Sequence, residues 1–187
     1  LSHLDDRGAA RRVDVSGKTA SARSATAIGA VHTTDEVIGL IASGGLPKGD
    51  ALATARVAGI LAAKRTSELI PLCHQLALSG VDIDFHIGSQ RIDLSATVRT
   101  TDRTGVEMEA LTAVAVAALS VYDMIKAVDP AARIDGICVQ RKEGGKTGVW
   151  TAGSSGASAA TATRAGACSF KGGGATRLMC RAAWPSR

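Results

Sequence analysis

Residues 103–128 read RTGVEMEALTAVAVAALSVYDMIKAV, and they are the most informative stretch of the chain. Apolar residues recur in it at steps of three and four, which predicts a long helix. Because other apolar residues fill most of the remaining faces, we expect the helix to be enclosed on nearly all sides. The ionisable residues Glu109, Asp123 and Lys126 would then lie away from bulk water.

Two explanations fit ionisable groups in such a helix. Burying an unpaired charge costs several kcal/mol, so charged groups persist where they are paired or where they perform chemistry. The simpler explanation is an Asp123–Lys126 ion pair, whose three-residue spacing supports the helix. On this stretch alone both explanations stay open.

The rest of the pattern predicts one α+β domain in which helices cover an antiparallel sheet. The predicted elements are a strand at 23–31, a helix from Thr34 to Gly44, a helix from 51 to about 65 capped by Asp50, a hairpin at 81–99 and a strand at 133–142. In the hairpin, a two-residue turn at Gly88-Ser89 would pair Phe85 with Ile92 and set Asp84 opposite Asp93.

The flanks differ from the domain, which we place at residues 21–150. Residues 1–20 form a polar arm whose Val13-Asp14-Val15 could anchor on a sheet edge. Residues 151–187 form a basic tail of low complexity, and its lack of apolar periodicity predicts disorder. The tail is either a basic interaction arm or an incidental extension, and its scattered charges favour the second explanation.

Composition excludes several classes of protein. The net charge of +5 lies entirely in the tail, so the body is neutral, and aromatic residues make up only 3% of the chain. Both observations argue against nucleic-acid binding. We expect no membrane segment and no secretory signal, because neither a long charge-free apolar run nor a basic-then-apolar N-terminus is present. Four cysteines without paired spacing predict reduced thiols and a cytoplasmic location.

Two lysine-containing segments are candidates for binding phosphate. Lys48 precedes a predicted helix, whose free backbone amides favour an anion. Residues 142–148 form a glycine-rich basic loop that could be an anion-binding nest, although such loops are more often plain turns. His74 follows Leu72-Cys73 and suits hydrogen bonding or proton transfer better than metal binding, with a structural role equally open.

If Glu109 and Asp123 belong to one site, helix geometry predicts that this site is shared between subunits. Glu109 and Asp123 differ by fourteen residues, so they lie on one stripe of the helix but about 21 Å apart. One small substrate cannot touch both in a single chain. Two antiparallel copies of the helix across a two-fold axis would bring Glu109 of one chain toward Asp123 of the other.

Several motifs together resemble the family of molybdenum cofactor biosynthesis protein C, the cyclic pyranopterin monophosphate synthases. They are LPKGD at 46–50, LIPLCH at 69–74, TGVEMEALT at 104–112, YDM at 122–124 and GGK at 144–146. The resemblance covers residues 1 to about 150. It implies a ferredoxin-like subunit and a homohexamer built as a trimer of dimers, with sites at the dimer interface.

The resemblance also implies a lyase reaction. The substrate would be (8S)-3′,8-cyclo-7,8-dihydroguanosine 5′-triphosphate, a nucleotide-derived triphosphate, and the products cyclic pyranopterin monophosphate and pyrophosphate. It implies no tightly bound cofactor and no metal site in the protein, with Mg²⁺ as an optional companion of the triphosphate.

By motif, Asp123 corresponds to the catalytic acid/base, and Lys48 and Lys126 to essential lysines. The implied substrate-binding residues are Leu72, Cys73, His74, Glu107, Met108 and Glu109, and the implied triphosphate-binding cations are Arg56, Lys64 and Lys146. Ile125 stands where the family often has Cys, and Gln75 where Pro is common. A noncatalytic nucleotide-binding or scaffold protein is the alternative, but the intact reactive positions favour the enzyme.

Overall fold

The computed structural model describes residues 7–9, 12–146 and 148–153, so the predicted disordered tail from residue 154 onward lies outside the described residues. The elements are β1 Ser21–His32, α1 Asp35–Ser43, α2 Ala51–Lys64, α3 Thr66–Leu69, β2 Leu78–Ile87, β3 Arg91–Asp102, α4 Glu107–Ile125, β4 Arg133–Glu143 and β5 Trp150–Thr151. The predicted order of strands and helices is confirmed, and the short elements α3 and β5 are additions to it.

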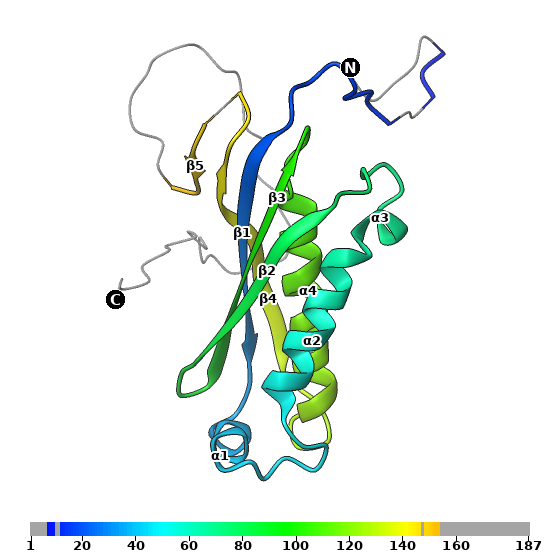
Figure 1. Cartoon of the computed structure of the whole chain (residues 1–187). Helices are drawn as coiled ribbons and strands as arrows, with labels where there is room; N and C mark the ends of the chain where they lie inside the picture. The colour runs from blue at the N-terminus through cyan, green and yellow to red at the C-terminus, as the bar shows by residue number, and fades with distance from the viewer. Residues whose placement is uncertain (1–6, 10–11, 147, 154–187) are drawn as a thin grey trace, which may run out of the picture.

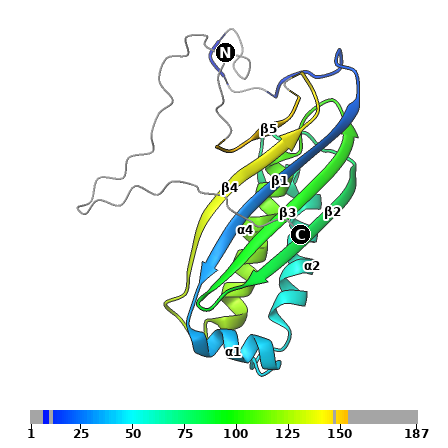
Figure 2. The ribbon, with the colours of Figure 1, turned by 90° about the vertical axis from the view of Figure 1, so that its left-hand side faces the viewer.

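The strands form one antiparallel sheet in the order β2-β3-β1-β4-β5. Helices α2 and α4 lie side by side on one face of this sheet, and α1 closes one end (Figure 1). The turned view shows the strands in front of α4 and α2, with the other face of the sheet toward the viewer (Figure 2). The predicted α+β class, an antiparallel sheet covered by helices, is therefore confirmed.

Helix ends are formed as the sequence predicts. The hydroxyl of Thr34 accepts a hydrogen bond from the backbone N–H of Val37, and Gly44 ends α1 in the left-handed conformation with φ 70°. The carboxylate of Asp50 accepts from the backbone N–H of Ala53 at 2.9 Å and begins α2. Local side-chain chemistry thus sets where both helices begin.

Helix α4 is the central element of the core, but it is not enclosed on all sides as predicted. The sheet covers one side and α2 a second, which leaves a third side open. Leu119 is 58% exposed there, and Asp123 and Lys126 lie on the surface, whereas Glu109 is buried at 4% exposure. By length and composition α4 could span a membrane, but 56% of its apolar window is buried inside the protein, as in the core helix of a soluble domain.

The predicted register of the β2–β3 hairpin is wrong by two residues. Phe85 lies opposite Leu94, not Ile92, and the two-residue turn is Ser89-Gln90, not Gly88-Ser89. A slip of two residues leaves every side chain on its own face of the sheet. The alternation of apolar and polar residues therefore cannot distinguish these two registers.

Charge pairing explains which register the hairpin adopts. In the observed register His86 lies opposite Asp93, and Asp84 lies opposite Ser95. The predicted register would have set Asp84 directly opposite Asp93. Since like charges directly opposite each other destabilise a strand pair, the observed register removes that cost.

Close packing of α2 on α4 depends on a glycine. A Cβ atom at Gly59 would lie 2.4 Å from Cδ1 of Ile83, 2.9 Å from the backbone oxygen of Ala113 and 3.2 Å from Cβ of Ala117. Two of these atoms belong to α4, so any side chain at residue 59 would push the two helices apart.

We expect Gly59→Ala to destabilise the protein by about 1–3 kcal/mol, because overpacking outweighs the gain in helix propensity. Gly39→Ala in α1 is the matched control, since nothing lies within 4 Å of its Cβ position. The control should be neutral or stabilising. Urea unfolding of both variants measures the difference, and equal stability of the two would contradict the packing role of Gly59.

Candidate active site

The reactive residues lie in two groups at opposite ends of α4. Asp123 and Lys126 lie at the C-terminal end with Lys48, whereas Glu107 and Glu109 lie at the N-terminal end. The helix is continuous between them, which separates Glu109 from Asp123 by about 21 Å. The structure therefore agrees with the prediction that one chain cannot bring both residues to one small substrate.

At the C-terminal end, one carboxylate lies between two ammonium groups. Nζ of Lys48 donates to Oδ2 of Asp123 at 2.7 Å and to its backbone oxygen at 2.8 Å, and Nζ of Lys126 lies 2.7 Å from Oδ1. Hydrogen bonds from Lys126 and then Lys48 lower the pKa of Asp123 to about 2. The predicted Asp123–Lys126 pair is confirmed, and Lys48 joins it instead of serving the helix end.

This arrangement fixes the charge of each group near neutral pH. Asp123 is a carboxylate, and its hydrogen bond raises the pKa of Lys126, which stays an ammonium ion. All three side chains are between 40% and 53% exposed. In the single chain this end of α4 is therefore an open, charged surface and not an enclosed pocket.

At the N-terminal end of α4 lies a cavity of about 380 Å³, here called the His74 pocket. Its lining includes all six residues that the motif resemblance assigns to substrate binding, together with three residues of the N-terminal arm: Leu72, Cys73, His74, Glu107, Met108, Glu109, Val13, Val15 and Lys18. Residues 69–74 and 104–112 are far apart in sequence, but the fold makes them two walls of one pocket.

Burial sets the acid–base properties of the His74 pocket. Burial, followed by the nearby charge of Glu107, raises the pKa of Glu109. Burial, followed by the charge of Glu109, raises the pKa of the Cys73 thiol. Glu109 is thus shifted toward the protonated form that can donate a proton, and Cys73 is shifted away from the nucleophilic thiolate.

A second cavity of about 210 Å³ adjoins the first, and we call it the cationic pocket. Five basic side chains line it: Lys18, Arg23, Arg103, Lys142 and Lys146. Glu107 and Lys18 line both pockets, and Nζ of Lys142 lies 3.0 Å from Oε1 of Glu107. Such a concentration of cations suits a polyanion such as a chain of phosphates.

The glycine-rich loop predicted to bind anions forms one wall of the cationic pocket. Gly144 and Gly145 have φ angles of 91° and 72°, which favour glycine. A Cβ at Gly145 would lie 2.5 Å from a guanidinium nitrogen of Arg23. The loop therefore packs directly against one of the pocket's cations.

Sequence reasoning did not single out Lys18, Arg23, Arg103 or Lys142 as site residues. Antiparallel pairing of β1 with β3 sets Ser21 opposite Asp102, and Nε of Arg23 donates to the backbone oxygen of Asp102 at 2.9 Å. This brings Arg23 close to Arg103, a proximity that no local pattern reveals. Lys142 had a weak signal, as the first residue of the glycine-rich loop.

Two predicted triphosphate-binding residues line neither pocket in the single chain. Nε of Arg56 donates to the backbone oxygen of Ile83 at 3.0 Å, and the guanidinium lies over the ring of Phe85. Lys64 is exposed in the last turn of α2. Lys146, the third of these cations, does line the cationic pocket.

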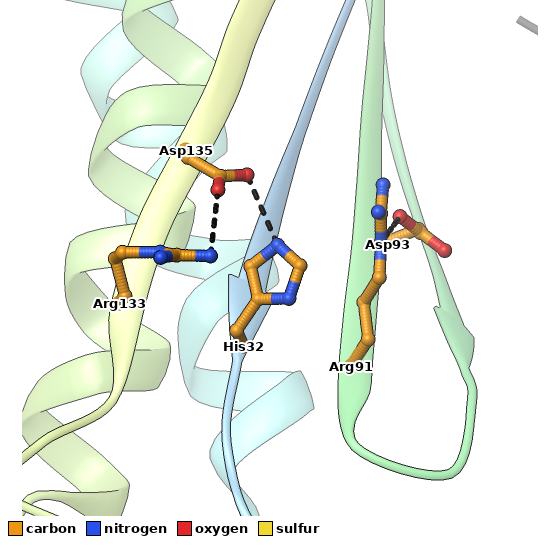
Figure 3. A network of polar contacts seen from close by, with 5 residues as sticks. All are labelled: His32, Arg91, Asp93, Arg133 and Asp135. Atoms are coloured by element: carbon orange, nitrogen blue, oxygen red, sulfur yellow. Dashed lines mark hydrogen bonds and ion pairs between the residues drawn. The ribbon is translucent and has the colours of Figure 1, made fainter. Parts of the chain in front are cut away.

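A further charged network lies on the open face of the sheet. Figure 3 shows His32 and Arg133 both directed at Asp135, with Arg91 paired to Asp93 on the neighbouring strand. His32 ends β1, whereas Arg23 of the cationic pocket lies near its start. The network is therefore at the other end of the sheet from the two pockets.

The fold and site define an α+β protein in which a pocket lined by five cations adjoins a pocket that carries a histidine and two glutamates. The model of the MoaC family matches residues 12–145, and the chain belongs to this family.

Curated relatives agree with this assignment. The chain is similar to cyclic pyranopterin monophosphate synthase 2 of Mycobacterium tuberculosis, with 68% identity over 81% of this chain and 90% of the relative. It is 60% identical to cyclic pyranopterin monophosphate synthase of Streptomyces coelicolor over 81% of this chain and 89% of the relative. The protein of the same name from Chloroflexus aggregans is 57% identical over 80% of this chain and 92% of the relative.

We expect the side-chain carboxyl of Asp123 to titrate near pH 2, below its ordinary value of 3.8. Because its folded-state pKa is lowered, the ion pair stabilises the fold above pH 3.8, and this contribution is lost as the pH falls through about 2. Lys48→Ala and Lys126→Ala should each raise the titration midpoint. Carbon NMR of the Asp123 carboxyl measures the titration midpoint. An unchanged midpoint in both variants would contradict the pairing of Asp123 with Lys48 and Lys126.

Proposed function

We infer that the protein is a cyclic pyranopterin monophosphate synthase, a lyase of molybdenum cofactor biosynthesis. Its substrate is (8S)-3′,8-cyclo-7,8-dihydroguanosine 5′-triphosphate, and its products are cyclic pyranopterin monophosphate and pyrophosphate. The observation that carries the inference is that the cationic pocket opens directly beside the His74 pocket, sharing Lys18 and Glu107 with it. One ligand can thus place phosphates in the first and a reacting ring in the second.

The cationic pocket supports binding of the triphosphate and release of pyrophosphate. Lys142 and Lys146 come from the end of β4 and its loop, and Arg103 from the end of β3. Ammonium and guanidinium groups stabilise the negative charge that develops on a leaving pyrophosphate. Mg²⁺ would bind mainly through the phosphates, because five cations line the pocket and outnumber its two carboxylates, Glu107 and Glu143.

The His74 pocket supports proton transfer. Rearrangement of a purine-derived ring into a pterin requires protons to leave some ring atoms and arrive at others. His74 brings an imidazole ring to this pocket, and the pKa of the buried Glu109 is raised toward the form that donates a proton. The two side chains line the same cavity and can act on the same ring.

We propose that Asp123, Lys126 and Lys48 of a neighbouring subunit complete this site within a homohexamer built as a trimer of dimers. The separation of the two groups along α4 supports sharing between chains. So does the uncovered apolar side of the helices, which includes Leu119 at 58% exposure and Val57 of α2 at 59%. Lys126 and Lys48 would bring cations, and Asp123 a carboxylate, to the partner's pockets.

We further propose that the subunit is ferredoxin-like and that the protein is cytoplasmic. The order β1, α2, β2, β3, α4, β4, with β1 and β3 central in the sheet, supports the first proposal. The thiol of Cys73, which forms no disulfide among the residues that the structure describes, accords with the second.

We expect Asp123→Asn to lower turnover of the cyclic triphosphate at least about 100-fold, since it removes the carboxylate that the family resemblance assigns as the catalytic acid/base while keeping the shape of the side chain. Asp84→Asn is the matched control, because Asp84 is exposed on the open face of β2. Product formation by purified protein measures both. A wild-type protein that binds the substrate without turnover would support the noncatalytic alternative. Near wild-type turnover in Asp123→Asn would contradict the catalytic role of Asp123.

We expect Lys142→Ala and Lys146→Ala each to weaken binding of inorganic triphosphate about tenfold or more, because each removes a charged hydrogen bond to phosphate. Arg133→Ala on the open face of the sheet removes the same charge outside both pockets and is the control. Titration calorimetry measures the affinities. Equal affinity of all three variants would argue against phosphate binding in the cationic pocket.

Mixing two inactive variants tests the shared site. Glu109→Gln and Asp123→Asn impair different halves of each site, so exchange of subunits should create sites that hold neither substitution. Under random mixing about a quarter of the sites would be intact, and activity should rise accordingly. Mass measurement confirms exchange. Absence of recovery in mixed oligomers would place both residues in the site of one chain.

A further inference from the structure

Residues 12–20 of the N-terminal arm lie outside the sheet and the helices, but they pack against the two pockets. The prediction that Val13 to Val15 would anchor on a sheet edge is wrong, because they belong to no strand. The half-buried side chains of Val13 and Val15 line the His74 pocket, and Lys18 lines both pockets. The arm is thus a wall of the site.

A hydrogen bond ties the arm to the histidine. Nε2 of His74 lies 2.8 Å from the backbone oxygen of Val13. A carbonyl oxygen only accepts hydrogen bonds, so Nε2 must carry the hydrogen. In the neutral ring this leaves Nδ1 as the nitrogen that can accept a proton or a hydrogen bond.

The segment that carries His74 has little regular structure of its own. It lies between α3 and β2, and a turn in which the N–H of Cys73 donates to the oxygen of Ile70 at 3.0 Å precedes it. The ring therefore depends on a contact from elsewhere in the chain to hold its orientation. The Val13 carbonyl, 61 residues earlier, supplies that contact.

The same arm delivers a cation. The N–H of Lys18 donates to the oxygen of Val15 at 3.0 Å, and the N–H of Ser16 donates to the carboxylate of Asp14 at 2.8 Å. These bonds fold residues 14–18 into a turn. The turn directs Lys18 to the boundary between the two pockets while Val13 and Val15 remain against the histidine.

We propose that the arm is a positioning element of the active site, with two parts. The Val13 carbonyl holds His74 in the form protonated at Nε2, so that Nδ1 is the acceptor presented to the substrate. The turn places Lys18 where the phosphate chain joins the nucleoside-derived part of the substrate. This role rests on the function proposed above for the same site.

The test uses the full chain with Val13→Ser/Val15→Ser, which removes both apolar anchors but leaves the core intact. Ser16→Ala is the matched control on the same arm, since Ser16 is exposed and its backbone bond to Asp14 remains. Proton NMR of histidine-labelled protein reports the Nε2–H signal of His74, which His74→Gln assigns. A hydrogen-bonded N–H exchanges slowly with water and gives a resolved signal.

We expect the signal in the wild type and in Ser16→Ala, and its loss in the double variant. The double variant should also lose about 10- to 100-fold in kcat/KM, the cost of a misplaced catalytic group, without a change in melting temperature. Loss of the signal with full turnover would overturn the positioning role of Val13. If the double variant kept both the signal and full turnover, the positioning role of the arm would be overturned.

Lys18→Met tests the role of Lys18 separately. This test remains available even if the double variant does not fold. Lys18→Met should weaken binding of inorganic triphosphate and leave the Nε2–H signal unchanged, and an unchanged affinity would overturn the role of Lys18. The NMR readout does not need turnover. A wild-type protein that showed the signal but made no product would therefore overturn the proposed function, whereas the hydrogen bond from the arm would stand.

Discussion

Close packing of α4 against the sheet and α2 fixes the positions of both groups of reactive residues. Gly59 lets α2 approach α4, and a Cβ at Gly29 of β1 would lie 2.8 Å from a methyl carbon of Val114. Because the two helices pack this tightly on one face of the sheet, α4 is held rigidly in place. The two ends of α4 carry chemically different groups of residues, and the length of the helix fixes the distance between these groups.

The carboxyl groups at the two ends of α4 are stabilised in different ways. At the exposed C-terminal end, two ammonium groups hold Asp123 as a carboxylate. At the N-terminal end, Glu109 is buried and shifted toward its neutral form, while Glu107 is paired with Lys142 beside a group of cations. One chain thus presents a carboxylate held by two lysines at one end, and a cavity lined by five cations beside a buried glutamate at the other.

In the proposed assembly, this division would give each subunit two incomplete halves of a site. In that proposal the cationic pocket would bind the phosphates, and the adjoining His74 pocket would supply the groups that move protons. The exposed apolar side of α4 and α2 lies between the two ends and provides a surface through which a second copy could bring its Asp123 close. Assembly and catalysis would then depend on the same helix, since changes that displace α4 would alter both the interface and the pockets.

The longer helices and strands and the class of chemistry could be predicted from the sequence. Periodicity located α4, capping residues set the starts of α1 and α2, and the motifs at 69–74 and 104–112 identified the residues of the His74 pocket, because these signals are local in the chain. Tertiary structure alone decided the hairpin register, since a slip of two residues leaves the alternation of Phe85 and its neighbours unchanged. It also decided that Arg23 meets Arg103, that the arm reaches His74, and that Asp123 is exposed in the single chain. Those outcomes depend on which distant segments pack together, and the spacing of residues along one chain does not contain that information.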